Sequence, residues 1–294
     1  MFQDNLLTGK RILVTGGGTG LGRAIAKKYL SLGAAIHICG RREAVLRETA
    51  SELMATYDGS AVHVHAVDIR DADAVDLMIA DIFDKHGPLT GLVNNAAGNF
   101  VSRTEDLSHR GFNAIADIVM RGTFYVTHAV GRRWISAGLP GSVVSIVVTW
   151  VFNGGPYVVP SAMSKSAVQS MTKSLAIEWG GYGIRLNAIA PGVFPTEGAS
   201  ARLAPGEGMS WRADENPMRR VGQIHELQNL ATFLMADGVD WLTGQTIAID
   251  GGNWLANGGN FFAYRDRTDA DWQRMREEIK VQNAKDKAQR SVKS

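Results

Sequence analysis

A glycine-rich segment near the start of the chain, residues 11–22 with the sequence RILVTGGGTGLG, restricts the fold more than any other feature. The apolar run 11–14 predicts a buried strand, and the apolar spacing over 21–32 predicts a helix, so the glycines lie in the turn between them. Gly16, Gly20 and Gly22 allow a tight turn and a close approach to a pyrophosphate, which the N–H groups at the helix start stabilise. The segment therefore indicates a dinucleotide site.

The rest of the chain continues the same alternation of short apolar runs and helical patterns. Apolar runs bounded by turn residues are typical of buried parallel strands, and they occur at Arg11–Val14, Ala35–Cys39, Ala61–Val67, Gly91–Asn94, Ser142–Val148, Ile184–Ala190 and Gln245–Ile249. Helix-like spacing occurs between them, at Leu21–Leu32, Glu43–Tyr57, Asp73–His86, Phe112–Ala137, Ser161–Trp179 and Ile224–Ala236. The alternation predicts an α/β fold, a doubly wound parallel sheet with helices on both faces.

The composition excludes several classes of protein. The chain has 31 basic and 29 acidic residues, and this balance gives no sign of nucleic-acid binding. The longest apolar stretch, 143–152, contains Ser145 and Thr149 and is far shorter than the roughly 20 residues that span a bilayer. Cys39 is the only cysteine, which excludes an intrachain disulfide and a multi-cysteine metal site. With an N-terminus unlike a signal peptide, these features predict a cytoplasmic protein without a membrane partner.

Charged and small residues follow the predicted strands where a ligand would bind. Arg41 and Arg42 follow the second strand and can pair with a 2′-phosphate, where NAD-binding chains place a carboxylate, so the pair favours NADPH. Asp68 follows the third strand, and the run 94–98, with the sequence NNAAG, follows the fourth. His37, His63 and His65 have no ligand-spaced carboxylate or cysteine partners, so we interpret them as packing or hydrogen-bonding residues and predict no metal site.

Together these motifs resemble the short-chain dehydrogenase/reductase family over about residues 8–256. TGGGTGLG, the NNAAG run, Lys165, the pair 191–192 and the DGG run 250–252 occur in the family's order and spacing. The resemblance implies a single Rossmann-type domain of seven parallel strands, assembly as a homotetramer and hydride transfer from a nicotinamide. It implies a cofactor site formed by Gly16, Gly17, Gly18, Thr19, Gly20, Leu21, Arg41, Asp68, Asn95, Lys165, Pro191, Gly192, Val193 and Phe194.

The sequence departs from the family's usual catalytic residues. The tyrosine that acts as acid or base four residues before the lysine is Ser161 here, the family's serine is Val148, and its asparagine in the preceding long helix is Val119. Only Lys165 remains. Because a serine hydroxyl lacks the acidity of a phenol with a pKa near 10, the usual oxidation of an alcohol is disfavoured.

One branch of the family, the 2,4-dienoyl-CoA reductases, departs in the same way, and the chain resembles it at 97–100, 157–165 and 196–203. The resemblance implies that Lys165 and Ser161 hold the nicotinamide ribose and that Asn99 bonds the thioester carbonyl. A fixed donor such as the Asn99 amide would stabilise the enolate oxygen that develops during reduction. The acyl-CoA site would be lined by Arg70, Asn99, Phe100, Ser108 and Arg202.

The proton donor of that branch is missing. Trp150 replaces the tyrosine of the mitochondrial type, and Val119 replaces the aspartate of the peroxisomal type. An indole N–H can donate a hydrogen bond but cannot release its proton at neutral pH, so we expect Trp150 to steady an enolate while water protonates it. Tyr157 and Asp117 are the other candidate acids. The rival functions are reduction of another enoyl or carbonyl compound and a catalytically silent NADP-binding module.

Two regions stand outside the repeating pattern. Residues 194–221 are rich in glycine, proline and charge, and they predict a lid within a catalytic domain that covers 1–267. Residues 268–294 predict a charged, helical C-terminal tail.

Overall fold

The computed structural model describes residues 1–57, 60–196, 213, 216–256 and 262–291. Most of the predicted lid, together with Arg202, lies outside these residues. The chain divides into two compact units, Met1–Trp254 and Leu255–Ser294. The division into a domain 1–267 and a tail 268–294 stays a prediction.

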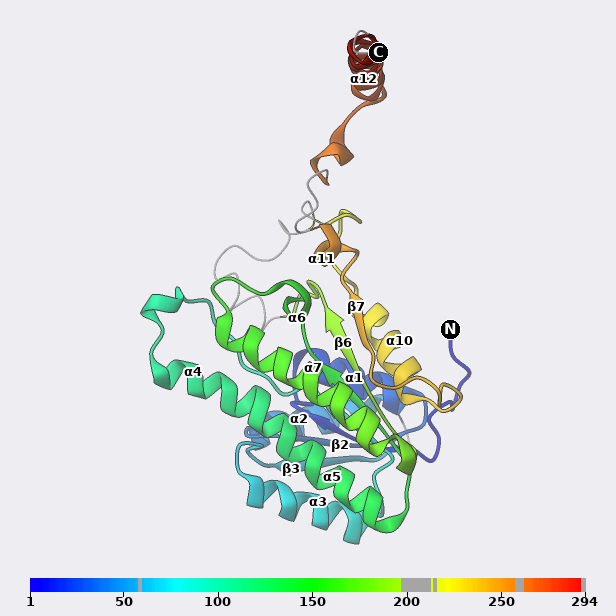
Figure 1. Cartoon of the computed structure of the whole chain (residues 1–294). Helices are drawn as coiled ribbons and strands as arrows, with labels where there is room; N and C mark the ends of the chain where they lie inside the picture. Colours follow the sequence, from blue (N-terminus) through cyan, green and yellow to red (C-terminus); the bar gives the residue numbers. More distant parts are fainter. Residues whose placement is uncertain (58–59, 197–212, 214–215, 257–261, 292–294) are drawn as a thin grey trace. The chain divides into compact units, whose positions relative to one another are not determined.

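The first unit contains a seven-stranded sheet in the order β3-β2-β1-β4-β5-β6-β7 (Figure 1). Every neighbouring pair is parallel, and the register runs without a break, for example from Arg11 opposite Ala35 to Thr15 opposite Cys39. The predicted doubly wound α/β fold is confirmed. The strands are β1 (Arg11–Thr15), β2 (Ala35–Gly40), β3 (Val62–Ala66), β4 (Gly91–Asn94), β5 (Gly141–Ile146), β6 (Ile184–Pro191) and β7 (Thr246–Ile249).

Helices cover both faces of this sheet and bury its apolar side chains (Figure 1). On one face pack α1 (Gly20–Ser31), α2 (Glu43–Thr56) and α10 (Ile224–Met235), and on the other α3 (Ala72–His86), α5 (Thr123–Ala137) and the C-terminal part of α7 (Val159–Trp179). The inner strands β2, β1, β4, β5 and β6 are mostly buried on both faces, which explains their nearly continuous apolar sequences. Among the described residues, no helix combines the length and apolarity needed to cross a bilayer.

The long helix predicted at 112–137 differs from the observed one. It starts earlier, as α4 (His109–Ala116), and passes through a π-helical segment, η2 (Asp117–Gly122), before α5. At Gly122 a Cβ atom would lie 2.7 Å from Ile69 Cγ1, so only glycine allows the chain after β3 to pack this closely. Segments of π-helix often occur at functional sites.

Four histidines form a cluster at β2, β3 and the end of α3. The Nδ1 atom of His37 lies 2.9 Å from Nε2 of His65, and the His37 ring stacks on His63 with centroids 4.6 Å apart. His86, which the sequence analysis did not single out, completes this histidine cluster beside His63. Packing and hydrogen bonding, the interpretation drawn from the sequence, describe these contacts. Burial and the neighbouring positive charges lower the pKa of His65 to about 4.

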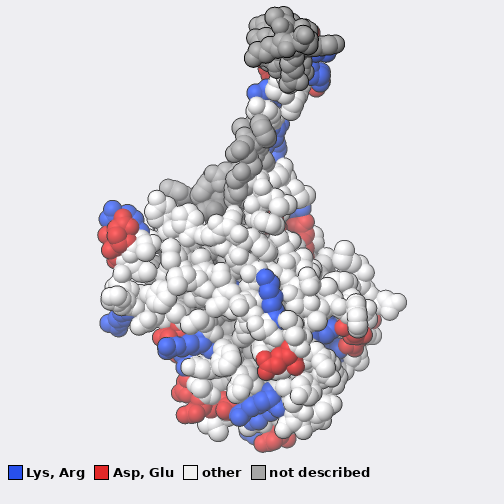
Figure 2. All heavy atoms as spheres, viewed as in Figure 1, with Lys and Arg blue, Asp and Glu red and all other residues white. Residues whose placement is uncertain are grey.

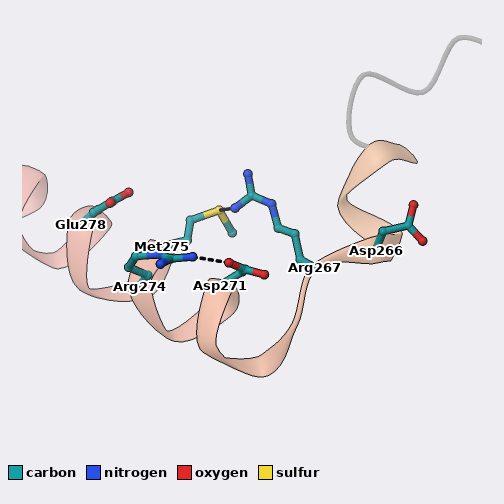
Figure 3. A pocket seen from close by; sticks show the side chains of 6 residues that line it. All are labelled: Asp266, Arg267, Asp271, Arg274, Met275 and Glu278. Carbon is teal, nitrogen blue, oxygen red and sulfur yellow. Dashed lines mark hydrogen bonds and ion pairs between the residues drawn. The ribbon is translucent and has the colours of Figure 1, made fainter.

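The second unit contains η4 (Phe262–Asp266) and the helix α12 (Asp269–Ser291). Its side chains line a groove of about 490 Å³, shown in Figure 3. In this groove Arg274 pairs with Asp271, and Arg267 lies 3.0 Å from the Met275 sulfur and stacks on Tyr264.

Candidate active site

The predicted site residues gather at one edge of the sheet. Because all seven strands are parallel, their carboxyl ends lie together, and ligands of such sheets bind outside these ends. The first residues beyond β1, β2 and β4 are Gly16, Arg41 and Asn95, and Gly192 follows β6 directly. Asp68 comes two residues after β3. The topology thus brings together residues separated by more than 170 positions in the sequence.

The glycine-rich turn leaves space where side chains would otherwise stand. Gly16 and Gly20 have positive φ angles of 64° and 56°, which glycine adopts without strain. A Cβ atom at Gly17 would overlap Ile38 Cγ2 at 2.5 Å. Thr19, the residue before α1, makes no side-chain cap, and the first turn contains no acidic residue. The N–H groups at the start of α1 are therefore available to a phosphate.

The NNAAG run, residues 94–98, holds the end of β4 against the glycine-rich turn. The Thr15 hydroxyl accepts hydrogen bonds from the backbone N–H groups of Asn95 at 2.9 Å and Ala96 at 3.0 Å, and it donates to the Val93 carbonyl at 3.3 Å. The Asn95 amide donates to the Thr15 carbonyl at 3.0 Å. Sequence reasoning missed Thr15, although a threonine that ends an otherwise apolar strand was the available signal.

Arg41 and Asp68, both assigned to the predicted cofactor site, follow the ends of β2 and β3. Arg41 is exposed and forms no ion pair with the described residues, so its guanidinium is available to a phosphate. Asp68 is bound by Arg70, whose Nε lies 3.0 Å from both carboxylate oxygens. Hydrogen bonds from Arg70 hold the pKa of Asp68 below its usual range, and the charge of Arg41 acts in the same direction.

Lys165 and Ser161 are buried one turn apart near the start of α7, with exposed fractions of 7% and 5%. The Lys165 ammonium group donates to the Ile146 carbonyl at the end of β5. Burial lowers the pKa of Lys165 to about 8, because the charged form loses its hydration. The Ser161 hydroxyl has no hydrogen-bond partner among the described residues. The two side chains therefore offer a cation and a free hydroxyl to a ligand.

The Asn99 amide is oriented as a donor. Its Oδ1 accepts the backbone N–H of Phe100 at 2.9 Å, which leaves its NH₂ group to point elsewhere. Phe100 lies against α4, since a Cβ atom at Gly111 would be 3.4 Å from its ring. The Ser108 hydroxyl caps α4 by accepting the Gly111 N–H at 3.1 Å. Three of the five residues predicted to line the acyl-CoA site thus lie at or just before the start of α4.

Trp150 starts the short helix α6 (Trp150–Asn153). Its indole lies over the backbone of Gly155, where a Cβ atom would be 2.9 Å from two of its ring atoms. The indole N–H donates to none of the described residues. Of the alternative acids, Asp117 forms an ion pair with Arg121 at 3.1 Å, and Tyr157 is 58% exposed.

The segment after β6 forms the last part of the predicted cofactor site. The Gly192 N–H donates to the Ile249 carbonyl at 3.0 Å, and a Cβ atom at Gly192 would be 2.6 Å from that of Asp250. Val193 accepts the Gly222 N–H at 2.9 Å, and Phe194 is buried against Gly222. These contacts fix 191–194, with Pro191 ending the strand, at the edge beside the other candidate residues. Uncapped helix N–H groups, glycines without space for a side chain and an arginine that pairs with no described residue together fit a phosphorylated dinucleotide.

Residues 16–253 match the enoyl-(acyl carrier protein) reductase family, which covers most of the chain. The chain is a short-chain dehydrogenase/reductase. A probable 2,4-dienoyl-CoA reductase 3 [(3E)-enoyl-CoA-producing] of Caenorhabditis elegans is 43% identical to it over 268 residues, which cover 88% of this chain and 85% of the relative. A probable 2,4-dienoyl-CoA reductase [(2E)-enoyl-CoA-producing] of Bacillus subtilis is 38% identical over 84% of this chain and 97% of the relative.

Solved structures agree with this assignment of the family. A gluconate 5-dehydrogenase from Burkholderia cenocepacia, in complex with NADP and tartrate, superposes with a TM-score of 0.79 at 31% identity, and the match covers 85% of this chain and 97% of that one. Short-chain dehydrogenase/reductases use NAD or NADP, so the chain is an oxidoreductase of this family and resembles the dienoyl-CoA reductases.

Proposed function

We propose that this chain uses NADPH to reduce a 2,4-dienoyl thioester of coenzyme A. The identity to dienoyl-CoA reductases supports the substrate class, and the orientation of the Asn99 amide carries the chemical argument. The Phe100 N–H bonds the amide oxygen, whereas the NH₂ group bonds none of the described residues and is available to donate to a ligand. A thioester oxygen that gains negative charge during reduction is the acceptor that such a donor stabilises most.

Different residues of the chain bind different parts of the cofactor. In this proposal the turn 16–21, Asn95 and the segment 191–194 hold the dinucleotide, Asp68 accepts a hydrogen bond from it, and Arg41 pairs with the 2′-phosphate that distinguishes NADPH from NADH. Lys165 and Ser161 hold the nicotinamide ribose. When bound, the reduced nicotinamide supplies a hydride.

Reduction of a dienoyl thioester adds one hydride and one proton. Addition of the hydride at the δ carbon places an electron pair on the thioester oxygen and the carbons between them, and Asn99 and Trp150 stabilise that oxygen by hydrogen bonds. Protonation at the α carbon then gives a 3-enoyl thioester, and protonation at the γ carbon gives a 2-enoyl thioester. Trp150 keeps its proton, so water completes the reaction. Arg70, Phe100, Ser108 and Arg202 bind the acyl-CoA.

Turnover of 2,4-hexadienoyl-CoA with NADPH tests this function through absorbance at the cofactor and dienoyl bands. Trp150→Tyr supplies an acidic phenol, and we expect it to raise turnover by about 10²–10⁴-fold, the usual range for general acid catalysis. Asn99→Ala should lower turnover, and Tyr157→Phe should leave it unchanged. If the wild type, Trp150→Tyr and Asn99→Ala all bind NADPH but leave it unoxidised, the dienoyl-CoA assignment is wrong. The remaining functions are then reduction of another enoyl or carbonyl compound and a silent NADP-binding module.

We also infer a homotetramer in the cytoplasm. Apolar side chains on two neighbouring helices support the assembly, because Phe124 on α5 and Met163 and Ile177 on α7 are 47%, 55% and 86% exposed. Light scattering coupled to size-exclusion chromatography measures the mass directly, and a monomeric mass would reject the tetramer.

A further inference from the structure

Two residues assigned to different ligands share one ion pair. Asp68 belongs to the proposed cofactor site and Arg70 to the proposed acyl-CoA site. Arg70 Nε contacts both Asp68 carboxylate oxygens at 3.0 Å, its Nη2 lies 2.5 Å from Oδ2, and its backbone N–H lies 3.1 Å from Oδ1. The four contacts come from three N–H groups, because Nε contacts both oxygens, so they occupy most of the about four acceptor positions of the carboxylate. Another donor at Asp68 therefore competes with Arg70 for the carboxylate.

The surroundings let the guanidinium move while its backbone stays in place. Ile69, between the two residues, packs against Gly122 of η2, where a Cβ atom would lie 2.7 Å from Ile69 Cγ1. The Asp68 and Arg70 side chains remain 31% and 41% exposed. They open onto a groove of about 400 Å³ that is also lined by Asp71, Asp117, Arg121 and Tyr125. On the face shown in Figure 2, acidic and basic side chains lie in small mixed groups of this kind.

The charges near this pair favour an exchange of partners. Arg41 acts on Asp68 from the side of β2, and Asp117 acts on Arg70 from the side of η2. A phosphate near Arg70 meets a cation whose charge Asp68 partly neutralises, because the pair is already formed. A ligand group that donates to Asp68 weakens that pair and leaves Arg70 more strongly attractive to a phosphate.

We propose that the Asp68–Arg70 ion pair couples the two sites, so that NADPH or NADP⁺ bound at Asp68 frees Arg70 for a phosphate of acyl-CoA. This inference rests on the proposed function, because it uses the ligands assigned there to Asp68 and Arg70. Coupling between two sites is reciprocal, so bound acyl-CoA must raise the affinity for the cofactor by the same factor. For a partly exposed ion pair we expect a factor of roughly two to five.

Titration with unreactive ligands measures this factor. Hexanoyl-CoA has no double bond to reduce and NADP⁺ carries no hydride, so calorimetry can give the Kd of hexanoyl-CoA with and without saturating NADP⁺. We expect the wild type to bind hexanoyl-CoA roughly two to five times more tightly with NADP⁺ present, and less so as salt screens the pair. Asp68→Asn keeps the shape of the side chain but should bring the ratio of the two Kd values to one.

The control breaks a matched ion pair elsewhere. Arg132→Gln removes the pair between Arg132 and Asp76, which are 2.8 Å apart and 48% and 43% exposed, and should leave both Kd values unchanged. A wild-type ratio of one, with both ligands bound and Arg70→Gln weakening hexanoyl-CoA, would overturn the coupling and leave the proposed function intact. An unchanged ratio in Asp68→Asn would overturn it too. Failure of the wild type to bind hexanoyl-CoA while it binds NADP⁺ would reject both the proposed function and the coupling.

Discussion

Raising the pH should weaken NADPH binding through Lys165. Burial lowers the pKa of its ammonium group to about 8, so the protonated fraction falls about tenfold between pH 7 and pH 9. If the ammonium form holds the nicotinamide ribose, the affinity for NADPH should fall by about the same factor. Losing a charge-assisted hydrogen bond costs about 1.5–3 kcal/mol, which is enough to weaken NADPH binding tenfold. The phosphate of the cofactor is already about nine-tenths ionised at pH 7, because its second pKa is about 6, and its remaining ionisation would strengthen binding as the pH rises.

The free energy of unfolding should rise with pH, whereas the affinity for NADPH falls. The unfolded chain binds a proton at this lysine up to its ordinary pKa of 10.5, whereas the folded chain releases it above about 8. The unfolded state therefore holds more protons between these values, and the contribution of Lys165 to stability rises with pH. At pH 9 the gain over pH 7 is about 1 kcal/mol. Weaker binding together with a constant or higher stability would exclude unfolding as the cause.

Fluorescence titration of NADPH from pH 7 to pH 9.5 tests this prediction, with Lys165→Arg as the matched variant. A guanidinium stays charged throughout, so the variant should show an affinity that does not change with pH, even if a poorer fit makes that affinity lower. A flat wild-type profile, or the same decrease in both proteins, would refute the reasoning. Denaturant unfolding over the same pH range supplies the stability.

Three further predictions concern specificity, acid stability and packing. Arg41→Ala should weaken NADPH roughly ten- to 150-fold more than NADH, as for a charge-assisted bond, and equal weakening in a fluorescence titration would reject the phosphate contact. Because the pKa of His65 lies below its ordinary 6.5, this residue should lower stability between pH 6.5 and about 4, with a loss near 1 kcal/mol at pH 5 after allowance for partial exposure. His65→Gln should reduce the fall in stability between pH 7 and pH 5 in urea unfolding by about this amount, while His37 and His63, whose pKa values are also lowered, keep the rest of it. Gly22→Ala places a Cβ atom 2.4 Å from the Asn95 amide nitrogen and should cost about 1–3 kcal/mol, whereas Gly180→Ala, with no atom within 4 Å, should cost nothing measurable in thermal unfolding.

The sequence predicts the sheet well because buried parallel strands are apolar on both faces. The run at 91–94 matches β4 residue for residue, whereas the run at 142–148 extends beyond β5, which ends at Ile146. The apolar pattern continues past this end because Val147 is buried and still donates its N–H to the Ile189 carbonyl of β6 at 2.8 Å. The π-helical segment 117–122 and the packing of Ile69 against Gly122 at its end were not predictable, since no spacing in the sequence reveals either.

At the candidate site, too, the sequence predicts which residues lie together but not the contacts that they make. Motifs after successive strands predict that Gly16, Arg41 and Asn95 lie at one edge, because the parallel topology puts them there. The hydrogen-bond partners of these residues depend on side-chain geometry, which the spacing of residues in the sequence does not reveal. The bond from Lys165 to the Ile146 carbonyl and the direction of the Asn99 amide are of this kind, and only the structure supplies them.

The contact between Trp150 and Gly155 restricts residue 155 more than residue 150. A Cβ atom at 155 would meet the Cγ and Cδ2 atoms of Trp150 and the Cγ2 atom of Val158, each at 2.9 Å. Phenylalanine and tyrosine carry Cγ and Cδ2 atoms too, so exchanging one aromatic residue for another at 150 leaves the need for glycine at 155 in place. Residue 150 can therefore change among aromatic residues in one step, whereas any side chain at 155 would have to displace both the ring and Val158.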